Sequence, residues 1–156
     1  YKEGEHMKKI LPALIIVISI ILVYFIFNKE TKIECSKKTL TDEYTLTSKY
    51  KVYYKNKEVY KILIEEEIEA STSTKLDEIT KNIDETYKNY QKEIGSYEYT
   101  ITKNKNKAIT KIIMDYNKMD MKAYIKYNPE AKLNNNKRYN IDDLKEMYEE
   151  RGIICK

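Results

Sequence analysis

The chain is poor in the residues from which phosphate-binding loops and acid–base centres are usually built. Its 156 residues include three glycines, a single histidine and no tryptophan. The glycines, Gly4, Gly95 and Gly152, are too scattered to form the glycine-rich loop that cradles phosphates. The histidine, His6, lies near the start, so the remainder has no imidazole to act as a base at neutral pH. No cofactor and no Ser-His or Cys-His pair is therefore expected.

Metal ions and nucleic acids are also poor matches for this composition. Cys35 and Cys155 are the only cysteines, and two cysteines so far apart without histidines match no zinc-binding spacing. The 29 basic and 25 acidic residues nearly balance, with a net charge of +4. Nucleic-acid-binding proteins carry a basic excess on one face. We expect neither a metal site nor a nucleic acid partner.

One long apolar run dominates what is present. Residues 10–27 carry no charge, and at about 1.5 Å per residue a helix of this length spans roughly 27 Å, close to the thickness of the hydrocarbon core of a bilayer. A helix in a soluble core would show a polar face, which this run lacks. A cleaved signal peptide has a shorter apolar region and a small-residue cleavage site, and neither is found. The run therefore predicts an uncleaved signal-anchor with the lipid bilayer as its partner.

This run divides the chain into predicted segments. We expect a cytoplasmic leader over 1–9, a transmembrane helix over 10–27, a membrane-proximal lead-in over 28–43, and an α+β domain over 44–156. Lysines flank the run on both sides, so positive charge alone does not decide its orientation. Short amino-terminal anchors ordinarily place their domain outside. The expected location is the cell membrane, single-pass, with the domain on the extracytoplasmic side.

In an oxidising compartment, an even number of cysteines predicts pairing. One cysteine follows the apolar run and the other is the penultimate residue, so we expect a disulfide between Cys35 and Cys155. The alternative is two free thiols in a cytoplasmic domain, which also requires the opposite topology.

Hydrophobic periodicity predicts two hairpins with a helix between them. Residues 44–54 alternate polar and apolar side chains, and after a turn at 55–58 residues 59–64 resume the pattern. Residues 97–101 and 108–116 form a second such pair around a turn at 104–106. Between the pairs, a helix starting near Thr74 and ending at Gly95 carries one apolar stripe: Leu76, Ile79, Ile83, Tyr87, Tyr90 and Ile94. A shorter helix is predicted to start at Asn140.

The predicted fold class is therefore α+β. It consists of an N-terminal transmembrane helix followed by an antiparallel sheet of two hairpins, packed on one long helix, with a shorter C-terminal helix. A short strand near residues 32–37 is a further possibility. We expect the other face of the sheet to stay in contact with water.

Three segments of the chain resemble the YehR-like family of small bacterial lipoproteins. They are residues 54–61 (YKNKEVYK), residues 90–126 (YQKEIGSYEYTITKNKNKAITKIIMDYNKMDMKAYIK) and residues 142–153 (DDLKEMYEERGI). The resemblance runs from about residue 44 to the end and lies in pattern and spacing. It implies an extracytoplasmic α+β domain but no activity, because none is established for the family. The chain departs from the family in having an uncleaved-looking anchor where the family has a lipid-modified cysteine.

Acidic residues and tyrosines are the remaining candidates for a site. Glu65, Glu66, Glu67 and Glu69 form one acidic cluster, and Asp142 and Asp143 form a pair; either group could bind a hard cation or act as acid and base, or simply lie in solvent. The chain has sixteen tyrosines but two phenylalanines. Exposed tyrosines can stack on glycans or pack against a protein. Tyr53, on the face of its strand opposite the predicted core, is the candidate binding residue.

We therefore expect a membrane-anchored extracytoplasmic domain that acts as a binding or envelope-associated module, with an envelope protein or a glycan as its partner. Because no catalytic constellation is visible, an enzyme is not expected. Two alternatives stay open. One is a carboxylate-dependent hydrolase of cell-wall polymers, which needs two carboxylates converging in a cleft. The other is a structural partner of another membrane protein, which needs a large apolar patch on the free sheet face.

Overall fold

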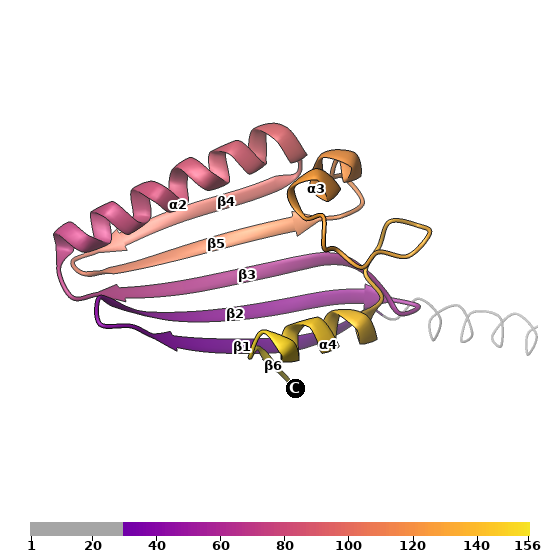
Figure 1. Cartoon of the computed structure of the whole chain (residues 1–156), viewed down its shortest axis with the longest axis horizontal. Helices are drawn as coiled ribbons and strands as arrows, with labels where there is room; N and C mark the ends of the chain where they lie inside the picture. The colour runs from indigo at the N-terminus through magenta and orange to yellow at the C-terminus, as the bar shows by residue number, and fades with distance from the viewer. Residues whose placement is uncertain (1–29) are drawn as a thin grey trace, which may run out of the picture. The chain divides into compact units, whose positions relative to one another are not determined.

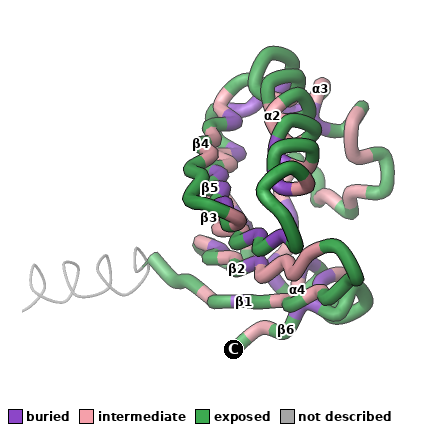
Figure 2. Tube along the Cα trace, turned by 90° about the vertical axis from the view of Figure 1, so that its left-hand side faces the viewer, coloured by how far each residue is buried: buried purple, intermediate pink, exposed green. Residues whose placement is uncertain are grey.

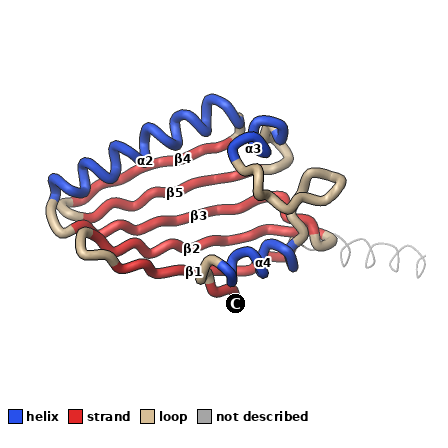
Figure 3. The backbone as a smooth tube through the Cα atoms, viewed as in Figure 1, coloured by secondary structure: helices blue, strands red, loops and turns tan. Residues whose placement is uncertain are grey.

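The computed structural model describes residues 30–156, which form an antiparallel sheet of six strands with three helices (Figure 1). The strands are β1 (Thr31–Leu40), β2 (Tyr44–Lys55), β3 (Glu58–Ala70), β4 (Tyr97–Asn104), β5 (Lys107–Asp115) and β6 (Ile154–Cys155). The helices are α2 (Ser73–Ile94), α3 (Met121–Tyr127) and α4 (Ile141–Glu150). The spatial order of the strands is β4-β5-β3-β2-β1-β6, so the last strand of the chain lies beside the first (Figure 3).

Both predicted hairpins form, and their turns explain why. The first hairpin joins β2 to β3 through Asn56 and Lys57, with φ angles of 50° and 66°. Two consecutive residues with positive φ are typical of the two-residue turn whose twist matches that of paired strands. The second hairpin joins β4 to β5 at Lys105, where φ is 53°. Strand β3 extends further than predicted, to Ala70, because it pairs with β2 along its whole length.

Side-chain capping sets the ends of the helices. The Thr72 hydroxyl accepts a hydrogen bond from the Lys75 backbone N–H, so α2 begins two residues before the predicted cap at Thr74. Gly95, with φ of 65°, ends it as predicted. Asn140 caps α4 through a hydrogen bond from the Asp142 N–H, again as predicted.

The expected arrangement of one long helix covering a sheet of two hairpins is wrong. The sheet has six strands because the ten-residue β1 pairs with β2 along its whole length, and β6 adds to the outer edge of β1. No single long helix carries this sheet. All three helices lie on the same side, but α2 contacts the half formed by β3, β4 and β5, whereas α4 lies over the half containing β1 (Figure 2).

The core is correspondingly divided. The larger cluster of buried residues lies between the central strands, α3 and α4, and includes Val52, Ile62, Tyr116 and Leu144. A smaller cluster lies at the start of α2 and contains Ile68, Ala70, Leu76 and Ala108. Of the predicted apolar stripe of α2, only Leu76 and Ile94 are fully buried, and Ile83 is half-buried. Helix α2 therefore buries its two ends more completely than its middle.

The prediction of a single-pass membrane protein is not supported. Residues 10–27, to which the transmembrane helix was assigned, lie outside the described residues. Within residues 30–156, no helix combines the length and the apolar character needed to cross a membrane.

The division of the core predicts different costs for two truncations on α2. We expect Leu76→Ala to lower the free energy of unfolding by about 2 to 5 kcal/mol, because it opens a cavity among fully buried neighbours. Ile83→Ala removes a half-buried side chain and should cost distinctly less. Urea denaturation of the two variants measures the difference. Equal losses would show that the middle of α2 is packed as tightly as its start.

Candidate functional site

A cavity of about 240 Å³ lies between the sheet and the segment that carries α3 and α4. Its floor comes from β2, β3 and β5, and its walls come from α3, α4 and the loop that joins them. Five tyrosines contribute to its lining: Tyr50, Tyr116, Tyr124, Tyr139 and Tyr148. We refer to this cavity as the tyrosine pocket.

Aromatic packing fixes the rings around the pocket. The centroids of Tyr50 and Tyr148 are 5.2 Å apart, which joins β2 to α4. Tyr116 meets Tyr124 edge-on at 5.4 Å and Tyr139 edge-on at 5.9 Å. Edge-on pairs at these distances are a favoured geometry, because the positive ring edge faces the negative ring face. The rings that pack together around the pocket therefore come from five separate parts of the chain.

Three of the phenol hydroxyls form a chain at the buried side of the pocket. The Tyr116 and Tyr124 oxygens are 3.3 Å apart, and the Tyr124 and Tyr139 oxygens are 3.0 Å apart. Each hydroxyl can donate one hydrogen bond and accept others, so the proton order along the chain can adapt to a ligand. Burial of such a chain is tolerated because its members satisfy one another.

All five phenols stay protonated at neutral pH. Burial is the largest cause that raises the pKa of Tyr116, Tyr124, Tyr139 and Tyr148 above the ordinary value for tyrosine. Burial also raises the pKa of Tyr50, although the hydrogen bond with Ser48 and, to a smaller extent, the charge of Arg151 act in the opposite direction. A neutral phenol is a hydrogen-bonding group and not a base. The pocket can therefore hold a polar ligand, but its tyrosines do not supply a phenolate.

Charges lie at the rim of the pocket. Arg151, just after α4, is 3.7 Å from the carboxylate of Glu130, and both side chains are more than half exposed. The Lys37 ammonium on β1 donates a hydrogen bond to the Arg151 carbonyl oxygen at 2.6 Å, which attaches this end of α4 to the sheet. Because the rim charges are paired, the mouth of the pocket carries little net charge.

The predicted acidic cluster is divided by the alternation of β3. Glu66 points to the helix side, where it accepts a hydrogen bond from the Tyr87 hydroxyl at 3.1 Å. Burial raises the pKa of the Glu66 carboxyl, and the Tyr87 hydrogen bond partly opposes this. Glu65, Glu67 and Glu69 lie on the other face, within ion-pair distance of lysines on β5.

The second predicted acidic pair does not converge with the first. Asp142 and Asp143 lie in the first turn of α4, and the Asp142 carboxylate accepts a hydrogen bond from the Lys57 ammonium at 2.9 Å. In the described residues, no group of three or more metal-binding side chains comes together.

Tyr53 lies where the sequence pattern placed it, on the sheet face away from the helices. It is half-buried on β2 between Val52, which is fully buried, and Tyr54. The Lys61 ammonium lies 5.7 Å above its ring and the Tyr60 ring is 6.4 Å away. The structure does not bring Tyr53 to the tyrosine pocket, which is on the other side of the sheet.

The tyrosine pocket was not predicted, because the sequence does not show which tyrosines come together. A signal was nevertheless present in the composition. Both phenylalanines, Phe25 and Phe27, belong to the apolar run, so all the aromatic rings of residues 30–156 are tyrosines. A core that needs only apolar volume does not require a hydroxyl on every ring, and buried hydroxyls need partners.

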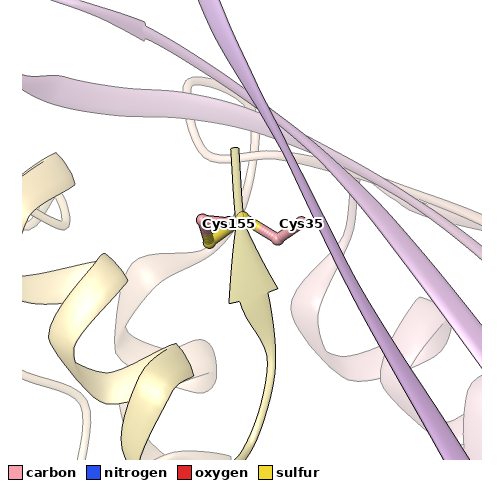
Figure 4. The surroundings of a disulfide bond; sticks show 2 residues. All are labelled: Cys35 and Cys155. Atoms are coloured by element: carbon pink, nitrogen blue, oxygen red, sulfur yellow. A yellow bond between two sulfur atoms is a disulfide. The ribbon is translucent and has the colours of Figure 1, made fainter.

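Cys35 and Cys155 form the predicted disulfide (Figure 4). They are directly opposite each other on β1 and β6, with Cα atoms 3.9 Å apart. This is shorter than the usual range of about 4.4 to 6.8 Å. The neighbouring residues Glu34 and Lys156 exchange both backbone hydrogen bonds, so the cysteines occupy the closely spaced position of the antiparallel ladder. The bridge holds the strand that follows Ile153, a residue of the pocket wall.

Comparison with known proteins identifies the fold. Neither a family model nor a curated protein matches the sequence. The NMR structure of the E. coli YehR protein is similar, with 16% identity, a TM-score of 0.56, and coverage of 81% of this chain and 91% of that one. An NMR structure of a protein from Streptococcus pneumoniae TIGR4 has 12% identity, a TM-score of 0.53, and coverage of 83% and 86%. The chain thus has a YehR-like fold.

The burial of Glu66 predicts that the substitution Glu66→Gln stabilises the protein, and that this effect depends on pH. A carboxyl whose pKa is raised in the folded state destabilises the fold when it ionises, so the penalty is absent below its unfolded pKa and present above its folded pKa. We expect Glu66→Gln to raise the free energy of unfolding at pH 7 and to have a smaller effect near pH 4. Thermal unfolding at both pH values checks this, with Glu67→Gln on the opposite face as control. An equal effect at both pH values would contradict it.

The disulfide predicts a strong dependence of stability on redox state. Because the bridge joins residues 120 positions apart in the sequence, its reduction should lower the free energy of unfolding by about 5 kcal/mol. Urea denaturation with and without dithiothreitol measures this loss. The double variant Cys35→Ser, Cys155→Ser should be insensitive to the reductant. A wild-type protein equally stable in both conditions would overturn the expectation.

Proposed function

We propose that the chain is a binding module and that the tyrosine pocket holds a small, neutral, polyhydroxylated ring, such as one sugar unit of a glycan. The observation that carries this proposal is the convergence of five protonated phenols on one cavity. Ligand pockets commonly combine apolar walls with a few well-placed polar groups, and this pocket has that character.

The chemistry of a sugar ring matches both parts of a tyrosine side chain. A pyranose presents an apolar face of C–H groups and an edge of hydroxyl groups. Tyrosine offers an apolar ring and a hydroxyl that both donates and accepts. The hydroxyl chain through Tyr124 can reorient its protons, which suits a ligand whose own hydroxyls do the same. A volume of about 240 Å³ favours a single ring.

The charges support a neutral ligand. Arg151 and Glu130 at the rim are paired with each other, so a charged ligand would have to compete with an existing ion pair. Raised pKa values keep the phenols uncharged, as described above. Neither feature favours a phosphate or a carboxylate over a neutral sugar.

Binding is favoured over hydrolysis by the distribution of carboxylates. Glycosidases of the usual kind place two carboxyl groups on either side of the bond that they cleave. Glu130 is the carboxylate that lines the pocket, and Arg151 neutralises it. Glu66 is hydrogen-bonded to Tyr87 beneath α2. The proposal is therefore of recognition without chemistry.

Two wider features accompany this proposal. The disulfide supports a site of action in an oxidising compartment, where such bridges persist, as expected for an envelope-associated module. The three similar segments together with the YehR-like fold support distant membership of the YehR-like family.

Titration of the full chain with N-acetylglucosamine, followed by ¹H–¹⁵N NMR, tests the proposal. We expect shifts at Tyr50, Tyr148 and Arg151. Tyr148→Phe keeps the ring and removes one hydroxyl, so it should weaken binding by up to about tenfold, the equivalent of one hydrogen bond.

Tyr53→Phe is the matched control, because it removes a hydroxyl from the opposite sheet face. It should leave the affinity unchanged. Shifts concentrated around Tyr53, or equal losses in the two variants, would overturn the assignment of the pocket. The absence of shifts with this sugar and with glucose, galactose and mannose would reject sugar binding.

A further inference from the structure

The sheet face away from the helices carries a second hollow, of about 600 Å³. It lies over β1, β2, β3 and β5, and the side chains on this face that line it are Glu34, Lys49, Lys51, Leu63, Glu65, Lys111 and Ile113. This hollow is separated from the tyrosine pocket by the thickness of the sheet. An inference about it is therefore independent of the proposed sugar site.

Two aliphatic side chains form the floor of this hollow. Leu63 on β3 and Ile113 on β5 are direct partners across the ladder, so they lie side by side on this face. Ile113 is 38% exposed, and Ile109, on the same face of β5, is also 38% exposed. In an antiparallel sheet with one face in solvent, the side chains on that face are normally polar. Aliphatic residues at its centre leave apolar surface in water with nothing in the described chain to cover it.

Lysines without ion pairs border this floor. Lys49 and Lys51 project from the same face of β2, with Cα atoms roughly 7 Å apart. Lys51 lies directly opposite Leu63 on β3 and Glu34 on β1, and Lys49 lies directly opposite Glu65 on β3. The nearby carboxylates already have partners: Glu65 is 3.7 Å from the Lys111 ammonium, and Glu34 is 3.3 Å from the Lys32 ammonium. Within residues 30–156, neither Lys49 nor Lys51 has a carboxylate at ion-pair distance.

The position of the hollow argues against an extended peptide as its occupant. Strands β2, β3 and β5 each have a neighbour on both sides, so their backbone hydrogen-bonding groups are used within the sheet. Peptides that bind sheets through main-chain hydrogen bonds need a free edge. An occupant at the centre of the sheet must be held by side chains alone.

We propose that this hollow binds an anionic amphiphile, with its aliphatic chain on Leu63 and Ile113 and its anionic group between Lys49 and Lys51. Charge complementarity favours the anion, because a neutral apolar occupant would remove from water two ammonium groups that have no carboxylate at ion-pair distance. The aliphatic floor selects the chain, because a purely hydrophilic anion would leave that surface exposed. The lysines and the aliphatic floor lie side by side, as the carboxylate and the aliphatic chain do in a fatty acid.

Site-resolved NMR on the full chain tests this assignment with sodium dodecanoate below its micelle concentration. The methyl groups of Leu63 and Ile113 serve as reporters. Residues 10–27 are apolar as well, so a bulk binding signal would not separate binding at the hollow from binding to that segment. We expect saturable shifts at both residues. Butyrate, with the same charge and a short chain, and dodecyl maltoside, with the same chain and no charge, should each bind at least tenfold more weakly.

The double variant Lys49→Gln, Lys51→Gln should weaken dodecanoate binding about tenfold. The matched control is Lys38→Gln, Lys122→Gln, which removes two charges from exposed positions outside the hollow and should change nothing. The proposal would be overturned by the absence of shifts at Leu63 and Ile113, by equal affinity for dodecyl maltoside, or by equal losses in the two double variants. Displacement of dodecanoate by hexaglutamate at a lower concentration than by decanoate would assign the surface to an acidic peptide instead, which also overturns it.

Discussion

The two-residue period of the central strand β3 is the constraint on which the rest of the structure depends. Because successive side chains point to opposite faces, Ile62 and Ile64 face the helices while Leu63 and Glu65 face away. A slip of one residue would exchange the two sets. The long pairing with β2 and with β5 holds the register from both sides. The floor of the tyrosine pocket and the floor of the second hollow are thus opposite surfaces of the same strand.

The disulfide and the tyrosine contacts complete the pocket from distant parts of the chain. The bridge joins β1 to β6, and the Tyr50–Tyr148 contact joins β2 to α4. Neither depends on local sequence preference. The Tyr50–Tyr148 contact connects a wall of the pocket to a strand of its floor, and the bridge fixes the strand that follows the wall residue Ile153, so both hold the carboxyl-terminal segment on the sheet. The shape of the pocket is therefore linked to the stability of the carboxyl-terminal segment.

Different parts of the fold were predictable for different reasons. The hairpins followed from the alternation and from short turns, both of which act within a few residues. The wider sheet did not, because the pairing of β6 with β1 joins opposite ends of the chain and leaves little trace in a two-residue strand. The long helix was predicted correctly, but it was expected to cover the whole sheet and covers only half of it. Its apolar stripe shows which face is turned inward, not how much of a sheet lies beneath it.

The sequence alone determined the helix caps at Asn140 and Gly95 and the placement of Tyr53 on the open face, because these depend on neighbouring residues. It also determined the pairing of Cys35 with Cys155, because the chain has only these two cysteines. Only the tertiary structure decided which tyrosines share a cavity. It also divided Glu66 from Glu65 and Glu67 and placed Leu63 beside Ile113. These outcomes depend on strand order and register, which come from contacts between residues far apart in the chain, and such contacts are not encoded in any local pattern.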